Sequence, residues 1–295
     1  MTVRVQTPIE LKFVENVMEK GGLAQVPNGT FDTLDFSSID QYLGCGEQFR
    51  RVRIMGEREK PSFAMDEGTG HHHALATNNT SKRDKGKTLK PAVMVDLAAA
   101  KMQELAKNAK KLVDVKKYFG EEKLDDGIKR AKIWYPEYLR KFDPDIEPDW
   151  VEQPFLKDVE VEGVKFKLAG VIDLTTKKKK LRDYKTSKAV KSQAEADSSV
   201  QLTLYSATTS LPDVGFLNFV KTANPYVAEI VSKRTPAQHA WAMLIAKRVF
   251  EAVQKEVFPL ANPTPQNWRC SEKFCGFWAT CRGKYESLSQ QKIKE

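Results

Sequence analysis

The sequence predicts an α+β fold, and three observations support this prediction. Residues 92–117 and 125–141 read as two helical segments. From residue 150 onward, apolar residues instead recur with the period of two that is typical of strands. A long helix is expected to begin at Thr235-Pro236, where a capping threonine precedes a proline at the first helical position. The chain therefore combines helices with a sheet that includes antiparallel strands.

The first part of the chain predicts short helices and polar connections. Residues 8–20 are expected to form an amphipathic helix. The segment LDFSSIDQYLGCG, from Leu34, has serine caps and a glycine stop just before Cys45. A further helix is expected to begin near Gly68. The stretch NNTSKRDKGKTLKP that follows it is polar and predicts a mobile linker.

The second half of the chain predicts the sheet. WVEQPFLKDVEVEGVKFKLAGVIDLTT reads as two strands that meet at Glu162-Gly163, and KLRDYKTS as a third. Asp197 or Ser198 is expected to cap a helix that runs to about residue 210. GFLNFVKT and YVAEIVSKR predict two further strands. One stripe of the last helix is expected to pack on the sheet, and its members are Trp241, Ile245, Val249, Val253 and Val257.

Composition limits the class of protein. The 295 residues are 41% hydrophobic and can bury a substantial core. We expect no transmembrane helix, because no apolar run approaches the length of about 18 residues that one needs. The N-terminus lacks the apolar core of a signal peptide, which favours the cytoplasm. The net charge of +9 favours a polyanionic partner such as nucleic acid, although many proteins carry such a charge merely to stay soluble.

A lysine-rich turn joins two strands that carry acidic residues. If strands 165–175 and 181–187 form a hairpin turning at KKKK, Asp173 lies across from Asp183, and Lys185 shares their face of the sheet. Facing carboxylates repel each other, but a hard divalent cation such as Mg²⁺ or Mn²⁺ reverses the sign of this interaction. The alternative is a solvated hairpin on which these charges lie together by chance.

The motif GVIDL…LRDYKTSK resembles the core motif of the PD-(D/E)XK nuclease superfamily, in its RecB-like branch. In that branch a G-T-x-x-H helix precedes the motif and a Q-x-x-x-Y helix follows it. Here Gly68-Thr69 with His72 and Gln201 with Tyr205 occupy those places, in the expected order. Two departures are an aspartate at the second acidic position and the lack of a proline before Asp173.

The resemblance implies a central mixed sheet flanked by helices, in a single nuclease domain 1–295 with a helical insertion at 78–145. It implies a metal site formed by His72, Asp173, Asp183 and the carbonyl oxygen of Tyr184. It also implies that Lys185 is catalytic, and that Gln201 and Tyr205 line the site and contact DNA.

Two neighbouring features of the predicted site are less specific. Three consecutive histidines on a helix point in different directions, so we expect His72 to reach the metal and His71 and His73 to be peripheral. Binding of an adventitious metal by the histidine run is the alternative. Glu152 precedes the hairpin on the neighbouring strand and could supply another carboxylate.

The four cysteines are Cys45, Cys270, Cys275 and Cys281, and three of them lie within twelve residues. Thiolates at this spacing suit Zn²⁺ or an iron–sulfur cluster. One distant cysteine and a trio resemble the iron–sulfur nucleases of the RecB-like branch, which include the AddB subunit and the nuclease of CRISPR adaptation. That resemblance implies a [4Fe–4S] cluster joining residue 45 to the segment 270–281, with Trp268, Phe274, Phe277 and Trp278 shielding it. Four residues, instead of the usual two, separate the first two cysteines of the trio, so a zinc site remains an alternative. Four unrelated buried thiols are a further alternative.

These features together predict a Mg²⁺- or Mn²⁺-dependent DNA nuclease. The expected activity is that of an exonuclease on DNA ends. The resemblance alone implies the setting, which is recombination, repair or phage DNA processing in the bacterial cytoplasm, or in the host cytoplasm if a phage encodes the chain. It also implies a recombination or single-strand-binding protein as a further partner. Arg50, Arg51, Arg53 and the lysines of 177–180 are candidate phosphate contacts or else solvated surface charges. The alternative function is an inactive nucleic-acid-binding module with a structural zinc or iron–sulfur site.

Overall fold

The computed structural model describes residues 31–57, 61–109, 111, 118–119, 123–262, 267 and 269–284. These residues form two compact units. The first comprises the described residues of Pro61–Phe155 and Gly170–Ala242. The second comprises the described residues up to 57, Leu156–Ala169, and those from Met243 onward. The expected helix 8–20 and the side chain of Trp268 lie outside the described residues, and the single-domain organisation stays a prediction.

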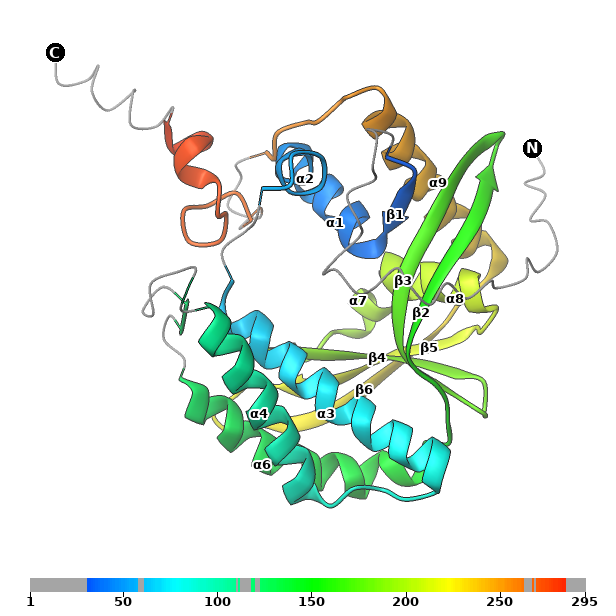
Figure 1. The fold of residues 1–295 in the computed structure, drawn as a ribbon. Coiled ribbons are helices and arrows are strands. Elements are labelled where there is room, and N and C mark those ends of the chain that lie inside the picture. Colours follow the sequence, from blue (N-terminus) through cyan, green and yellow to red (C-terminus); the bar gives the residue numbers. More distant parts are fainter. Residues whose placement is uncertain are drawn as a thin grey trace, which may run out of the picture. The chain divides into compact units, whose positions relative to one another are not determined.

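The sheet is mixed, with the order β1-β3-β4-β5-β6 and with β2 paired to β3 (Figure 1). Strands β2 (Pro148–Val161) and β3 (Val164–Thr176) pass through both units. In the first unit, β3 pairs with β4 (Lys180–Ser187) in antiparallel fashion. Strand β5 (Asp213–Val220) is parallel to β4, and β6 (Tyr226–Lys233) is antiparallel to β5. The five predicted strands and the α+β class are therefore confirmed.

Three helices of the first unit pack on one another and on one face of the sheet. They are α3 (Phe63–Lys85), α4 (Pro91–Ala109) and α6 (Leu124–Lys141). Their core is aromatic-rich and includes Trp134 together with Tyr184 of β4. The Tyr184 hydroxyl accepts a hydrogen bond from Asn79 Nδ2 of α3 at 2.7 Å. Because side chains alternate along a strand, Asp183 and Lys185 point to the opposite face.

The opposite face is covered by helix α8 (Val200–Thr209), which follows the short helix α7 (Gln193–Ser198). Ser192 caps α7 and Ser199 caps α8, each through its side-chain hydroxyl. The expected single cap at Asp197 or Ser198 is therefore wrong, because the chain breaks the helix in two at Ser199. This break places the α8 N-terminus, and with it Gln201, against the sheet.

Helix α3 differs from the sequence prediction. It begins at Phe63 and continues to Lys85, so it includes the first part of the stretch that was expected to be a mobile linker, and Gly86, with a φ of 64°, is its glycine C-cap. The reason is burial: Asn78 and Asn79 are fully buried. Asn78 donates a hydrogen bond to Asp143 at 2.9 Å, so its polar side chain is satisfied by a distant carboxylate.

The second unit contains strand β1 (Thr33–Asp35), helix α1 (Phe36–Gly44) and helix α2 (Gly46–Phe49). A short π-helical segment, Arg50–Ile54, follows. Strand β1 is parallel to the first part of β3, with Leu34 paired to Leu168. Strands β2 and β3 turn at Glu162-Gly163 with positive φ at both residues, as a two-residue hairpin requires.

Helix α9 (Pro236–Gln254) begins where the sequence predicts. Of its predicted packing stripe, Val249 and Val253 are buried. Trp241 is 66% exposed and Val257 is 52% exposed, so the prediction is wrong for these two residues. Val257 lies beyond the end of the helix, where the helical period no longer applies. In the part of the chain that is described, no helix has both the length and the apolarity to cross a membrane.

Candidate active site

The β3–β4 hairpin brings two aspartates together. Its main-chain pairs are Leu174 with Arg182 and Thr175 with Leu181, so one further step of this register places Asp173 across from Asp183. At this step a side chain replaces the main-chain pairing, because Asp173 Oδ2 accepts the N–H of Tyr184 at 2.7 Å. Both aspartates are buried, with 7% of Asp173 and 2% of Asp183 exposed. The predicted juxtaposition of the carboxylates is thus present.

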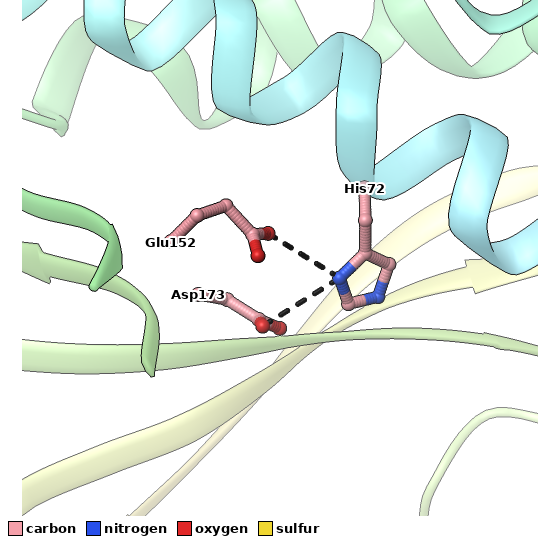
Figure 2. A group of neighbouring side chains, drawn as sticks. All are labelled: His72, Glu152 and Asp173. Carbon is pink, nitrogen blue, oxygen red and sulfur yellow. Dashed lines mark ion pairs between the residues drawn. The ribbon is translucent and has the colours of Figure 1, made fainter. Parts of the chain in front are cut away.

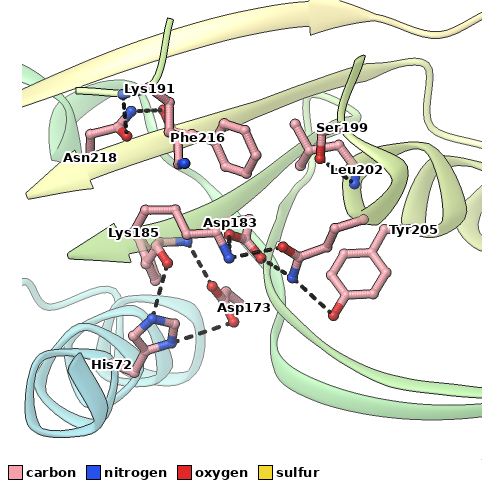
Figure 3. A network of polar contacts seen from close by, with 12 residues as sticks. His72, Asp173, Asp183, Lys185, Lys191, Ser199, Leu202, Tyr205, Phe216 and Asn218 are labelled. Carbon is pink, nitrogen blue, oxygen red and sulfur yellow. Dashed lines mark hydrogen bonds and ion pairs between the residues drawn. The ribbon is translucent and has the colours of Figure 1, made fainter. Parts of the chain in front are cut away.

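Lys185 lies beside Asp183 and is held by α8. Its Nζ is 2.7 Å from Asp183 Oδ2 and donates a hydrogen bond to Gln201 Oε1 at 2.8 Å. Gln201 Nε2 in turn donates to Asp183 Oδ1 at 2.8 Å and to the Tyr205 hydroxyl at 3.4 Å (Figure 3). The amide of Gln201 therefore contacts the lysine with its oxygen and the aspartate with its nitrogen, which fixes both groups relative to each other.

His72 reaches the same carboxylates from helix α3. Its Nε2–H donates to the carbonyl oxygen of Tyr184 at 3.1 Å. Its Nδ1 lies 3.5 Å from Asp173 Oδ1 and 3.6 Å from Glu152 Oε1 (Figure 2). A neutral imidazole that donates through Nε2 has a lone pair at Nδ1, and here this lone pair would face two carboxylates. A cation at Nδ1, either a proton or a metal ion, removes that repulsion.

Glu152 lies beside these side chains, where the sequence suggested a further carboxylate. Its backbone φ is 45°, which is unusual for a residue other than glycine within a strand. Its Oε1 is buried and has no hydrogen-bond partner in the structure. Strained backbone and unpaired polar atoms are typical of functional sites. A charged residue in a strand gives no sign of such a backbone conformation, so the sequence could not identify Glu152 firmly.

The site has a donor set suited to a divalent cation. His72, Glu152 and Asp173 each offer one ligand atom, and these three atoms lie within 4.8 Å of one another. Asp183 Oδ2 is also buried and makes no hydrogen bond, although the lysine ammonium lies close to it. Carboxylate oxygens with open lone pairs suit Mg²⁺ or Mn²⁺, so the residues present fit the metal that the sequence implied.

Electrostatics in the site favour protonation when no metal is bound. Burial raises the pKa of Asp183 to about 6, and the negative charge of Asp173 acts in the same direction, against the effect of Lys185. Burial opposes a charge on His72, but the carboxylates of Asp173 and Glu152 outweigh it and raise the pKa of His72 well above its usual value. Protons therefore occupy positions that a metal ion would take.

The other histidines of the run lie elsewhere. His71 is fully buried and its Nδ1 is 2.7 Å from the Tyr135 hydroxyl, away from the carboxylates. His73 is exposed. Of the three histidines, His72 has the ring that lies beside Asp173 and Glu152, and its role as a metal ligand stays a prediction.

The arginines that were expected to contact phosphates lie in the second unit and have intramolecular partners. Arg50 forms hydrogen bonds with both carboxylate oxygens of Glu47, at 2.7 and 2.8 Å. Arg51 binds Glu47 and the Thr280 hydroxyl, each at 2.9 Å. The Arg53 Nε–H donates to Gln41 Oε1 at 3.3 Å. A role in DNA binding stays a prediction for all three.

All four cysteines also belong to the second unit. None forms a disulfide and each is partly buried. Among the described residues, the compact set of ligand atoms noted above is formed by His72, Glu152 and Asp173, and no three of the four thiols meet the same 4.8 Å limit. Four thiols in one unit suit an iron–sulfur cluster or Zn²⁺ by their chemistry.

Comparison with known proteins gives the family. The model of the PD-(D/E)XK nuclease superfamily matches residues 33–282, so the chain belongs to this superfamily. The fold is similar to that of a "Putative exonuclease" from Eubacterium rectale, with a TM-score of 0.50 and 10% identity over 80% of this chain and 87% of that one. A second structure, SSO0001, has a TM-score of 0.42 and 14% identity over 87% and 89% of the two chains. No curated protein matches the sequence.

Family membership agrees with the site described above. The chain belongs to the PD-(D/E)XK nuclease superfamily, with a central mixed sheet flanked by helices and a candidate divalent-metal site formed by His72, Glu152 and Asp173.

Proposed function

We propose that this protein is a Mg²⁺- or Mn²⁺-dependent deoxyribonuclease that removes nucleotides from DNA ends. The observation that carries the proposal is the pair of buried carboxylates, Asp173 and Asp183, with the ammonium of Lys185 at 2.7 Å from one of them. Two buried like charges are unfavourable by themselves, but a bound divalent cation offsets their repulsion and can promote hydrolysis of a phosphodiester.

Four side chains would hold the metal: His72 through Nδ1, and the carboxylates of Glu152, Asp173 and Asp183. Tyr184 O, which was expected to be a further ligand, accepts the Nε2–H of His72 and so orients the imidazole. When bound, a divalent cation supplies Lewis acidity and lowers the pKa of water. The proposal adds Glu152 to the ligands expected from the sequence.

Lys185 is the proposed catalytic cation. Its side chain is 31% exposed, so it is accessible to a substrate, while Asp183 and Gln201 hold its ammonium in place. From there it can orient an attacking water molecule or offset the negative charge that develops on the phosphate. Gln201 positions both charged groups, and Tyr205 supports Gln201 through its hydroxyl.

The finer assignments rest on the order of motifs in the sequence. We place the chain in the RecB-like branch, with a [4Fe–4S] cluster at the four cysteines and a role in recombination, repair or phage DNA processing in the cytoplasm. A recombination or single-strand-binding protein is the partner that such a role would need. Zinc in place of the cluster is the second candidate for the cysteine site, and an inactive binding module is the second candidate for the whole protein.

The test is cleavage of end-labelled linear DNA, single- and double-stranded, with Mg²⁺, Mn²⁺ or EDTA. The variants are Lys185→Ala and, as a matched control, Lys165→Ala, whose ammonium is on a side chain that is 81% exposed. We expect metal-dependent degradation that is retained by Lys165→Ala and lost by Lys185→Ala. Degradation from the labelled end supports an exonuclease. If the folded, cofactor-loaded protein cleaves neither substrate, the inactive binding module replaces the proposal.

A further inference from the structure

Two segments far apart in the sequence meet in the second unit, and each carries cysteines. The N-terminal segment, residues 40–51, contains Cys45. The C-terminal segment, which comprises the described residues of 257–282, contains Cys270, Cys275 and Cys281. The contacts described next join these segments through residues near the cysteines in the sequence.

Two arginines join the segments by hydrogen bonds. Arg269 of the C-terminal segment binds Asp40 twice, through Nη2 to Oδ2 at 2.8 Å and through Nη1 to the carbonyl oxygen at 3.2 Å. Arg51 of the N-terminal segment donates to the Thr280 hydroxyl at 2.9 Å, and its guanidinium lies 5.3 Å from the centre of the Phe277 ring. Charge-assisted bonds of this kind contribute more to stability than neutral ones.

Apolar and main-chain contacts continue the same interface. The Tyr42 hydroxyl donates to the Val257 carbonyl oxygen at 2.6 Å. The rings of Phe49 and Phe258 stack with their centres 6.2 Å apart. Phe49 is fully buried, so this contact belongs to the core of the unit.

Gly46, the residue after Cys45, shows how closely the segments approach. A Cβ atom at Gly46 would lie 2.7 Å from the backbone nitrogen of Pro259 and 2.8 Å from the carbonyl carbon of Phe258. Backbone atoms cannot move aside as the end of a side chain can, so the position requires glycine. Cys45 therefore directly precedes the residue at which the N-terminal segment packs against the backbone of the C-terminal segment.

We propose that the two segments close on each other without any cofactor, so that the segments carrying the four thiols are already together when an iron–sulfur cluster binds. The inference rests on the proposed four-thiol site and goes beyond it, because it assigns the closure to Arg51, Arg269 and Gly46. The cluster then enters a unit that is already folded. Its loss exposes the thiols but leaves the segments together.

Amide hydrogen exchange of the cofactor-free protein, purified with a chelator, tests this proposal. In a variant with all four cysteines replaced by serine, we expect the protection of residues 45–49 to stay within about threefold of the native chain. In Arg51→Met/Arg269→Met, we expect that protection to fall by roughly tenfold or more. Gly46→Ala should have a similar effect, whereas Gly68→Ala, which has open space around the new methyl group, serves as the substitution control.

The reverse order of effects would overturn the proposal. If the serine variant loses protection at 45–49 and the arginine variant keeps it, the thiols or their cofactor hold the segments together. Protection of α4 in the first unit, measured in the same samples, detects general unfolding. If the arginine variant unfolds generally, the milder pair Arg51→Lys and Arg269→Lys replaces it, since lysine keeps the charge but cannot make the two-pronged contact.

Iron loading gives a second, independent measurement. Reconstitution of Arg269→Lys, which retains all four cysteines, should proceed about tenfold more slowly than that of the native chain. Loading at the native rate would contradict the proposal. Neither measurement uses nuclease activity, so failure of the proposed function leaves both results interpretable. If the chain keeps its amide protection but binds zinc and no iron, the two segments close as proposed and the cofactor assignment changes from an iron–sulfur cluster to zinc.

Discussion

Helix α3 takes part in two clusters of buried charge, and they are balanced in opposite ways. In the first, Glu67 is fully buried and is held by Arg130 at 2.7 Å and Lys221 at 2.5 Å. Burial opposes ionisation of Glu67, but neighbouring His71, Arg130 and Lys221 outweigh it and lower the pKa of its carboxyl. This carboxylate has more than one cation beside it, and the protein itself supplies them.

In the second cluster, the carboxylates of Glu152, Asp173 and Asp183 gather around Lys185 and His72. Here negative charge exceeds the permanent positive charge, and the pKa of Asp183 is raised where that of Glu67 is lowered. Removing one partner of a buried ion pair is costly, which is typical of a structural cluster, whereas an excess of buried carboxylates suits an external cation. The comparison therefore predicts a structural cluster and a functional one on the same helix.

The largest expected effect tests the functional cluster. Asp173→Asn removes a metal ligand and should lower DNA cleavage by about 10³-fold or more, because electrostatic stabilisation of the reaction is lost. The stability of the metal-free variant should change little, since the loss of a like-charge contact with Asp183 offsets the loss of the attraction between Asp173 and protonated His72. Steady-state cleavage and thermal unfolding in EDTA measure the two effects. Asp158→Asn, at an exposed position, is the control.

The opposite result is expected for the structural cluster. Glu67→Gln leaves the charges of Arg130 and Lys221 without their buried carboxylate and should lower the free energy of unfolding by about 3 kcal/mol. Urea denaturation measures this loss. Glu104→Gln, on a side chain that is 58% exposed, should stay within about 0.5 kcal/mol of the native chain. If Glu67→Gln were neutral in stability, the two clusters would not differ as argued.

The two clusters also show what a sequence can reveal. The hairpin site was predictable because one turn fixes the register, so Asp173, Asp183 and Lys185 could be placed by counting from its centre. The charge balance around Glu67 depends on Lys221, which is 154 residues away in the chain. No local pattern joins these residues, so the cluster emerges only when helix and sheet pack together.

The same limit explains the errors along helix α3 and strand β2. The polar stretch after His73 predicted a linker because its asparagines look solvated, yet Asn78 is satisfied by Asp143, a residue 65 positions away. Glu152 could be proposed only as a further carboxylate, because its positive φ is a property of the folded strand. Local preference decides segments that have no distant partner, and tertiary contacts override it elsewhere.

The pH dependence of the free energy of unfolding should distinguish the two clusters, and its measurement needs no activity assay. In the metal-free protein, Asp183 has a pKa of about 6, above its ordinary value of 3.8. The folded state then binds more protons than the unfolded state, so the free energy of unfolding should fall by about 3 kcal/mol as pH rises from about 4 to 6. The raised pKa of His72 acts with the same sign at higher pH, since its proton is lost last from the folded state.

Urea denaturation at several pH values, in EDTA and in excess Mg²⁺, measures this dependence. Asp183→Asn should flatten the decrease between pH 4 and 6, and Mg²⁺ should restore stability above pH 6 by binding the ionised carboxylates. A metal-free protein that becomes more stable over this range would contradict the assignment of an uncompensated charge to Asp183.

A smaller effect is expected from Gln201, which fixes the catalytic groups without carrying charge. Gln201→Leu removes its hydrogen bonds to Lys185 and Asp183 and should reduce kcat about 10- to 100-fold, the range for residues that orient metal ligands. Metal affinity and kcat should change together, whereas KM for DNA should change less. An effect on KM alone would instead assign Gln201 to DNA binding, as the sequence first suggested.

The smallest expected effect concerns the surface lysines. Lys178, in the β3–β4 turn, is 51% exposed at its side chain and lies 3.2 Å from Glu147, itself 53% exposed. Such an exposed pair contributes at most about 1 kcal/mol, so Lys178 can exchange this partner for a DNA phosphate. Arg51, by contrast, is 17% exposed and binds Glu47 and Thr280 within its own unit. Lys178 is therefore the better candidate for a phosphate contact.

Lys178→Ala should leave stability unchanged and reduce the slope of log K for duplex DNA against log salt by about 0.9, as expected for one lost phosphate contact. Binding is measured in Ca²⁺ or with Asp173→Asn, so that DNA is not cleaved. An unchanged slope would show that Lys178 is a solvated charge. Arg51→Met should instead leave the slope unchanged and lower stability, because its partners lie within the protein. If Arg51→Met also reduces the slope of log K against log salt, Arg51 contacts a DNA phosphate, as the sequence first suggested.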